Sequence, residues 1–300
     1  MDGENGSTRH AGGDPNATMT VPRHYTLRRL AVQRTSWIRS SPTQHRVLEE
    51  IEWDVLVVLD ACRLDSLRRV ARWPIREVES PASATPDWLD VAETNGVLAG
   101  TRIVAANPHY RTHEFDLGER EVVDLSESEW DPEVGTVPPE PVLERADERR
   151  RATSDPVVCH LMQPHAPYLV RVDGTWVNYF ASEYTAGWTS PRTVYATTLL
   201  ASGTIDSEEA RAAYEASVAA VWDAVRPYVG RWVGEGETVV VTSDHGEVFG
   251  ELRNAGLYNH PSRCFLPELV TVPLMVFDRE SSVGEPETPE QRLRRLGYRR

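Results

Sequence analysis

The chain has 300 residues, of which 40% are hydrophobic and 26% charged, a composition typical of a globular protein with one large domain or two smaller ones. Its 32 basic residues, all of them arginine, are outnumbered by 46 acidic residues, which gives a net charge of −14. This acid excess repels phosphate backbones, so we expect no nucleic-acid partner, and together with the absence of lysine it indicates a halophilic protein.

Cysteine usage and hydropathy indicate the compartment. The three cysteines, Cys62, Cys159 and Cys264, are too far apart in the sequence for a zinc ribbon or a disulfide framework. Residues 1–21 lack the apolar core of a signal peptide, and no stretch approaches the roughly 18 apolar residues of a membrane span. We therefore expect a cytoplasmic protein without an integral membrane segment.

We expect a single α/β domain over residues 22–278, between a polar N-terminal tail over 1–21 and a polar C-terminal tail over 279–300. Within the C-terminal tail, Thr288–Pro289 has the form of an N-cap followed by the first helical residue, which predicts a short helix.

Four short apolar runs predict the strands of the domain. Three of them, over 55–59, 157–162 and 238–242, are continuous runs of mostly β-branched and aliphatic residues, as in parallel strands buried on both faces. The fourth, over 272–277, contains Pro273, which lacks a backbone donor, and this predicts an edge strand.

Capping signals predict the helices between these strands. Thr85–Pro86 marks one start, and Asp206 with Glu209 three residues later marks another. The apolar spacing after Asp206 predicts a helix over 207–226, which Pro227 should end. Strands alternating with helices predict a doubly wound, mainly parallel sheet sandwiched by helices.

Two segments do not fit this alternation. Residues 116–154 are acidic and proline-rich, which predicts an irregular insertion or a small cap, and residues 170–202 form a second insertion. The aromatic residues of the second insertion form either a lid over a sugar or aryl group or a minor core: Trp176, Tyr179, Phe180, Tyr184 and Trp188.

Polar residues follow the three buried strands directly. The first strand leads into Asp60, the second into His165, and the third into Asp244 and His245. Loops that leave the carboxyl ends of parallel strands converge on one crevice, so these side chains should meet there. Two carboxylates and an imidazole form a suitable set for a divalent cation, although an aspartate at a strand end can also simply cap the following helix.

At these positions the sequence resembles the sulfatase-like branch of the alkaline phosphatase superfamily. The segment 239–247, Val-Val-Val-Thr-Ser-Asp-His-Gly-Glu, is similar to its signature strand and loop, and 57–65 resembles its first metal-binding motif. His165-Ala-Pro-Tyr168 resembles its His-x-Pro-Tyr segment, and the helix from Tyr214 and the closing Val272-Pro-Leu274 also fit. The likeness spans about residues 52 to 278 and implies a short, haloarchaeal-type member without the usual C-terminal subdomain.

The resemblance implies a role for each matching residue. Asp60, Asp244 and His245 become ligands of one divalent metal ion, which Mg²⁺, Mn²⁺, Ca²⁺ and Zn²⁺ all suit. His165 becomes the group that binds or protonates the transferred oxyanion, and Arg63 becomes a catalytic residue or a salt-bridge partner. His260 becomes a substrate contact or a second-metal ligand, and His109 a further substrate contact.

The nucleophile departs from the family pattern. Family members place a Cys, Ser or Thr at the start of the helix after the first βα unit, but the corresponding segment here, 80–88, has no cysteine, so the formylglycine route is excluded. The position two residues before proline is the inert Ala84. Thr85 is the best candidate, both as nucleophile and as metal ligand, and Ser83 is second. The alternative for Thr85 is a plain N-cap.

These residues predict a metal-dependent hydrolase that acts on phosphate or sulfate esters of a small molecule or glycan through a hydroxyl nucleophile. One alternative is a transferase that moves a phospho-alcohol or sulfate to a glycan or lipid acceptor. A second alternative is a non-catalytic descendant of the fold that only binds a metal or an anion.

Overall fold

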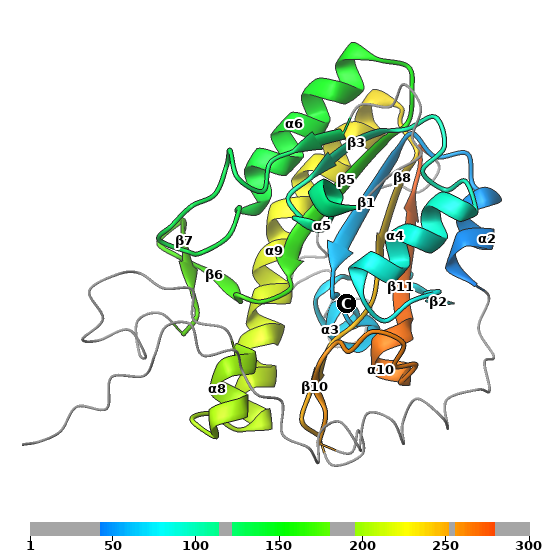
Figure 1. Ribbon diagram of the computed structural model, residues 1–300. Helices are drawn as coiled ribbons and strands as arrows, with labels where there is room; N and C mark the ends of the chain where they lie inside the picture. Colours follow the sequence, from blue (N-terminus) through cyan, green and yellow to red (C-terminus); the bar gives the residue numbers. More distant parts are fainter. Residues whose placement is uncertain (1–42, 114–121, 181–195, 252–255, 280–300) are drawn as a thin grey trace, which may run out of the picture.

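The computed structural model describes residues 43–113, 122–180, 196–251 and 256–279 (Figure 1). The expected N-terminal tail, the helix start at Thr288–Pro289, and the aromatic residues Tyr184 and Trp188 lie outside the described residues. From residue 44 to residue 164, strands and helices alternate along the described chain, as the sequence predicts.

A seven-stranded sheet in the order β2-β11-β8-β1-β5-β3-β4 forms the centre of the fold. Its two central pairs, β1 with β5 and β1 with β8, are parallel, and Val55 of β1 lies opposite both Val157 and Val239. β11 runs antiparallel to β2 and β8, so the sheet is mixed but mostly parallel. The strands are β1 Val55–Asp60, β2 Arg76–Glu79, β3 Arg102–Ala105, β4 Val122–Asp124, β5 Val157–Pro164, β8 Val239–Ser243 and β11 Thr271–Phe277.

Helices cover both faces of the sheet because the central strands are apolar on both sides. Val55, Val57 and Leu59 of β1 pack into the core on one face, and Leu56 and Val58 pack into the core on the other. The first face carries α3 Leu64–Val70, α6 Pro139–Ala152 and α9 Ser207–Glu235, and the opposite face carries α2 Gln44–Glu49, α4 Thr85–Thr94 and α5 His109–Thr112 (Figure 1). The predicted doubly wound α/β sandwich is confirmed.

Two antiparallel hairpins and two short helices complete the described chain. The hairpins pair β6 Leu169–Val172 with β7 Thr175–Asn178 and β9 Val248–Phe249 with β10 Tyr258–Asn259. The short helices are α8 Ala196–Ser202 and α10 Pro267–Val270.

The start of α9 is confirmed, but its predicted end at Pro227 is wrong. The Asp206 carboxylate accepts hydrogen bonds from the backbone N–H groups of Glu208 and Glu209, both at 2.9 Å. The helix then continues through Pro227 to Glu235. Its last turns bury Trp232 completely against the sheet, and this burial outweighs the one backbone hydrogen bond that proline removes.

The prediction that the last strand is an edge strand is also wrong. β11 lies between β2 and β8, and its pairing with β8 begins only at Leu274. Pro273 lies opposite Glu77 of β2, and its carbonyl oxygen accepts a hydrogen bond from the Thr242 hydroxyl at 2.7 Å. The sheet therefore tolerates the missing donor at the point where β11 changes partners.

Much of the expected irregular insertion over 116–154 has regular secondary structure. Residues 122–124 form β4, and 139–152 form α6, which packs on β5 and α9. The prolines that suggested irregular structure instead occupy the N-cap and first turn of α6, where a missing N–H costs nothing. In the second insertion, Phe180 is completely buried in the main core, which favours the minor-core alternative for this residue.

Candidate functional site

Three elements bring a group of buried polar side chains to the carboxyl edge of the sheet. Asp60 ends β1, Asp244 and His245 follow β8, and Thr85 begins α4 on the neighbouring face. None of these four side chains is more than 2% exposed. The prediction that the strand ends converge is therefore confirmed for Asp60, Asp244 and His245, and Thr85, the predicted nucleophile, lies beside them.

The Thr85 hydroxyl lies at the centre of this cluster. Its Oγ1 donates a hydrogen bond to Asp244 Oδ2 at 2.7 Å and lies 3.3 Å from His245 Nε2. The same nitrogen lies 3.4 Å from Asp244 Oδ2 and 3.6 Å from Asp60 Oδ1. His245 Nδ1 donates to the carbonyl oxygen of Gly246 at 2.8 Å, so the Nε2 lone pair faces the hydroxyl and both carboxylates.

Thr85 does not act as the N-cap of α4. The N-cap is Ala84, which has extended backbone angles of φ −157° and ψ 148° and offers no side-chain cap. The helix therefore begins one residue earlier than the Thr-Pro pattern suggests, and the Thr85 hydroxyl is free to bond to Asp244. The N-terminus of this ten-residue helix points its positive dipole end toward the cluster.

The two carboxylates are held in place by donors and do not cap helices. Asn107 Nδ2 donates to Asp60 Oδ2 at 2.6 Å, and the N–H groups of Ala61 and His245 donate to Asp244 Oδ1. Asp60 Oδ1 has no hydrogen-bond partner among the described residues. Burial and the charge of Asp244 raise the pKa of Asp60, whereas His245 and other neighbours outweigh burial and lower the pKa of Asp244.

This donor set fits a divalent cation. Two adjacent buried carboxylates are costly unless a positive charge lies between them. The His245 nitrogen lies 3.4 Å from an Asp244 oxygen and 3.6 Å from the unpaired Asp60 oxygen, which is too long for strong hydrogen bonds but suits atoms that surround an ion. We conclude that Asp60, Asp244 and His245 could hold a metal, with Thr85 beside it.

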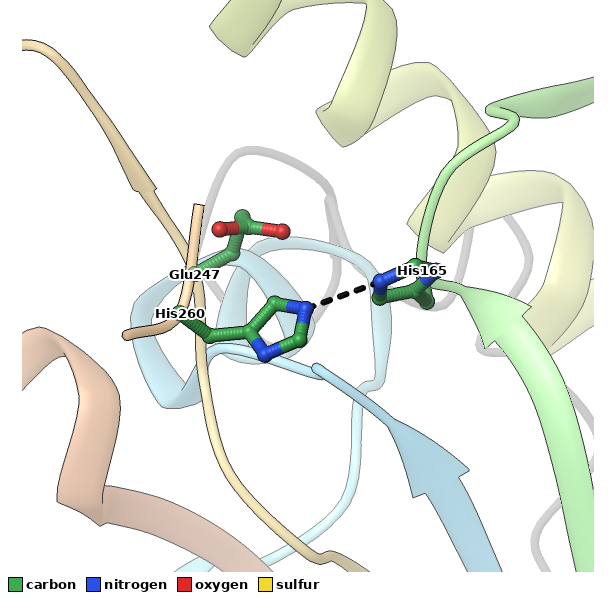
Figure 2. A group of neighbouring side chains, drawn as sticks. All are labelled: His165, Glu247 and His260. Atoms are coloured by element: carbon green, nitrogen blue, oxygen red, sulfur yellow. Dashed lines mark hydrogen bonds between the residues drawn. The ribbon is translucent and has the colours of Figure 1, made fainter. Parts of the chain in front are cut away.

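A pair of partly buried histidines lies next to the cluster. His165 Nε2 and His260 Nε2 are 2.8 Å apart (Figure 2). The His260 ring also stacks on that of His245 at a centroid distance of 4.3 Å. Because His165 Nδ1 donates to the Ala166 carbonyl oxygen at 2.7 Å, His165 Nε2 accepts a hydrogen bond from His260. Burial lowers the pKa of His165 to about 4, so both imidazoles are neutral near pH 7.

Glu247 lies beside this histidine pair (Figure 2). One ligand atom each from His165, Glu247 and His260 fit within 4.8 Å of one another. Glu247 is 1% exposed, and burial raises the pKa of its carboxyl group to about 8. The group is thus close to neutral at pH 7 in the protein without ions.

Arg63 and Ser83 are engaged elsewhere. The buried Arg63 guanidinium makes two bonds to Asp65 and others to the Glu247 carbonyl and to Glu251, which ties α3 to the loop after β8. The Ser83 hydroxyl donates to the Pro261 carbonyl oxygen at 2.8 Å and accepts from the Cys264 N–H at 3.0 Å. Both side chains hold loops of the site in position and do not face the Thr85 hydroxyl.

His109 begins α5, where its N–H donates to Asn107 Oδ1 at 2.9 Å. Burial lowers the pKa of its imidazole, and the nearby Asp244 and His245 act on it in opposite directions. The side chain thus lies within electrostatic reach of the cluster, while its substrate-binding role stays a prediction.

Three residues of the site were missed by sequence reasoning. Asn107 follows β3 as Asp60 follows β1, but the four-residue β3 is too short to stand out as an apolar run. His160 lies inside the apolar strand β5. The signal that could have identified it is a polar residue in a strand that is buried on both faces. Glu247 directly follows the Asp-His-Gly segment and could have been grouped with it.

The sheet order and the helices on both faces form an alkaline phosphatase-like α/β fold. No family model and no curated protein matches the sequence. The structure matches the soluble domain of lipooligosaccharide phosphoethanolamine transferase A from Neisseria meningitidis with a TM-score of 0.51 and 14% identity, over 74% of this chain and 75% of that one. It also matches the integral membrane form of that transferase with a TM-score of 0.52 and 13% identity, over 91% of this chain and 55% of that one.

At these identities the comparisons support the fold alone. The chain spans about half the length of the integral membrane transferase. Among the described residues, no helix is both long and apolar enough to cross a membrane.

Proposed function

We propose that the protein is a metal-dependent enzyme that cleaves phosphate or sulfate esters, with Thr85 as the nucleophile. The observation that carries this proposal is the Thr85 hydroxyl at the mouth of α4, bonded to Asp244 and 3.3 Å from His245 Nε2. A threonine that only stabilised its helix would occupy the N-cap, which is Ala84 here.

Asp60, Asp244, His245 and Thr85 would hold one divalent cation. When bound, the cation supplies positive charge that favours the ionised Thr85 hydroxyl and the anionic ester. Asp244 Oδ2 accepts the hydrogen bond of the Thr85 hydroxyl at an oxygen–oxygen distance of 2.7 Å, which leaves the lone pairs of the Thr85 oxygen for attack. Asn107, which bonds Asp60 at 2.6 Å and lies 3.4 Å from the Thr85 oxygen, orients both groups.

In the proposed reaction the Thr85 oxygen attacks phosphorus or sulfur in line, the bond to the leaving alcohol breaks, and a covalent ester on Thr85 forms. The Thr85 hydroxyl releases its proton to solvent by way of Asp244 Oδ2, and the leaving alkoxide takes up a proton from solvent to become the alcohol. The helix terminus and the His165–His260 pair face the charge that develops on the other oxygens. Water or an acceptor hydroxyl then releases the group and restores the Thr85 hydroxyl.

The test follows the covalent adduct and turnover together. We would strip the protein with a chelator, reload it separately with Mg²⁺, Mn²⁺, Ca²⁺ or Zn²⁺, and supply aryl phosphate monoesters, phosphodiesters and aryl sulfates. Peptide mass spectrometry should place a phosphate or sulfate on Thr85. Thr85→Val should abolish adduct and turnover, and Ser83→Ala should keep the adduct on Thr85. An adduct on Ser83, or full turnover by Thr85→Val, would refute the assignment.

A phospho-alcohol transferase is the second candidate, because the transferases named above share the fold and because Thr85 is only 2% exposed, which limits direct access of water. Both candidates share the first step and differ in the acceptor. With a phosphodiester donor, an added acceptor alcohol should take the group faster than water does if the protein is a transferase. Metal binding without any adduct would instead indicate the non-catalytic descendant.

A further inference from the structure

His160 is a completely buried histidine in the middle of β5. The alternation of β5 directs its ring to the face covered by α4 and α5, where it lies between two aromatic side chains. The ring packs edge-on against Trp88 at a centroid distance of 5.8 Å and against Tyr110 at 5.4 Å. These contacts fix its orientation, so both ring nitrogens have defined surroundings.

The two nitrogens of this ring differ. His160 Nδ1 lies 3.0 Å from the Tyr110 hydroxyl, within hydrogen-bond distance. His160 Nε2 has no hydrogen-bond partner among the described residues, and its nearest acidic atom, Asp244 Oδ2, is 3.7 Å away. Asp60 Oδ1, which belongs to the same cluster, is also without a partner among the described residues. Two unsatisfied buried polar atoms in one cluster require an explanation, because nearly all buried polar atoms in native proteins have a hydrogen-bond partner or bind an ion.

The spacing of these atoms matches the edges of a coordination shell. Ligands about 2.1 Å from a metal lie about 3.0 to 3.6 Å from their neighbours in a four- or five-coordinate shell. From Asp244 Oδ2, His245 Nε2 is 3.4 Å away and His160 Nε2 is 3.7 Å away, and His245 Nε2 is 3.6 Å from Asp60 Oδ1. Ligand atoms of Asp60, His160 and Asp244 all fit within 4.8 Å of one another.

We propose that His160 Nε2 is a further ligand of the catalytic cation beside Asp60, Asp244, His245 and Thr85, so that the strand beneath the site supplies a second imidazole. This inference rests on the cation of the proposed function, but it does not depend on the reaction. The Tyr110 hydroxyl then accepts the Nδ1 hydrogen and keeps the Nε2 lone pair directed at the ion, as outer-shell partners of metal-bound histidines do.

A second imidazole changes which ion the site prefers. Two carboxylates with one histidine suit Mg²⁺, Mn²⁺ and Ca²⁺ as well as Zn²⁺, whereas two carboxylates with two histidines favour zinc and disfavour the hard cations. The inference therefore narrows the four candidate cations of the sequence analysis to Zn²⁺ and similar borderline ions. Millimolar Mg²⁺ or Ca²⁺ should not displace zinc from the protein.

The test measures zinc binding on the whole chain without substrate. His160→Asn keeps a polar group near Tyr110 but has no atom at the Nε2 position, and it should weaken zinc binding by about 10- to 100-fold in competition titrations. His160→Gln, whose amide reaches further, should recover part of the affinity. X-ray absorption at one equivalent of zinc should count one imidazole fewer in His160→Gln than in the parent protein. His113→Asn is the matched control and should bind zinc like the parent.

Two outcomes would overturn the inference. One is unchanged zinc affinity in His160→Asn, with folding checked by circular dichroism. The other is weaker binding with an unchanged imidazole count in His160→Gln, since the ring would then only orient Asp244. A protein that binds zinc through His160 but forms no adduct on Thr85 would uphold this inference and refute the proposed function. An adduct on Thr85, together with zinc binding that does not involve His160, would uphold the proposed function and refute this inference.

Discussion

Gly246, the residue after His245, should not tolerate any side chain. Its backbone N–H donates to the Leu269 carbonyl oxygen at 2.7 Å, which holds the Asp244–His245 loop against α10. A Cβ at this position would overlap the Glu268 carbonyl oxygen and lie 3.1 Å from the Glu268 carbonyl carbon. A normal carbon–carbon separation of about 3.5 Å therefore requires the loop and α10 to part by at least about 0.4 Å.

The cost of Gly246→Ala follows from this contact. Overpacking of this kind costs about 1–3 kcal/mol, and loss of the hydrogen bond to Leu269 adds about 1 kcal/mol. For a domain of this size, about 2–4 kcal/mol corresponds to a Tm decrease of roughly 5–15 °C. The displacement also moves Asp244 and His245 relative to Asp60, so metal affinity should fall at least about tenfold.

The assay compares thermal unfolding and metal binding in two glycine variants. Gly234→Ala is the matched control, because Gly234 lies inside α9 and its added Cβ would meet nothing within 4 Å. The control should keep the parent's metal affinity and gain up to about 1 kcal/mol from the better helix propensity of alanine. If Gly246→Ala has the Tm and metal affinity of the parent protein, the steric argument is wrong.

Four further predictions test the fold and the site. Pro227→Ala should stabilise the protein by about 1–3 kcal/mol in denaturant unfolding, because it restores a hydrogen bond inside α9. A metal ion at 100 times its Kd should raise the Tm of the parent through about 2.7 kcal/mol of binding energy, and Asp60→Asn should show no such gain. Burial raises the pKa of Glu247 to about 8 from 4.5, so its protonated form stabilises the metal-free fold below about pH 4.5. This contribution disappears as the pH rises through 8. Glu247→Gln should flatten the resulting decrease in Tm, measured with a chelator present. Turnover should persist from low to molar salt, since salt screens distant surface carboxylates more than close contacts in a buried site, and a steep loss would contradict the halophilic interpretation.

The sheet could be predicted because its central strands are continuous apolar runs with no competing pattern. Val55 to Leu59 and Val239 to Val241 are buried on both faces, and no other element accommodates such runs as well. The two proline-based predictions, at Pro227 and Pro273, failed for one shared reason. Each assumed that a missing backbone donor decides the local structure, whereas the burial of residues on either side of the proline decided it.

Site residues that directly follow a strand could be predicted from the sequence. Site residues whose position depends on side-chain packing could not. Asp60, Asp244 and His245 are visible in the sequence because strand ends converge. The position of the Thr85 hydroxyl depends on a shift of one residue in the N-cap of α4, which lies below the accuracy of capping patterns. Arg63 was predicted to be a catalytic residue or a salt-bridge partner, and its contacts with Asp65 and Glu251 favour the second alternative.

An anionic substrate must approach a protein with a net charge of −14, and the Arg63 guanidinium is already paired with carboxylates. The positive charge of the Arg63 guanidinium is balanced by Asp65 and Glu251. His165 and His260 are neutral near pH 7. Under the proposed function, the positive charge that attracts the ester must then come from the cation and the N-terminus of α4. One divalent ion balances the charges of Asp60 and Asp244, and without it the Asp244 carboxylate repels the substrate. Metal loading should therefore be a condition for binding the anion at all, and inorganic phosphate should bind to the chelator-treated protein far more weakly than to the reloaded one.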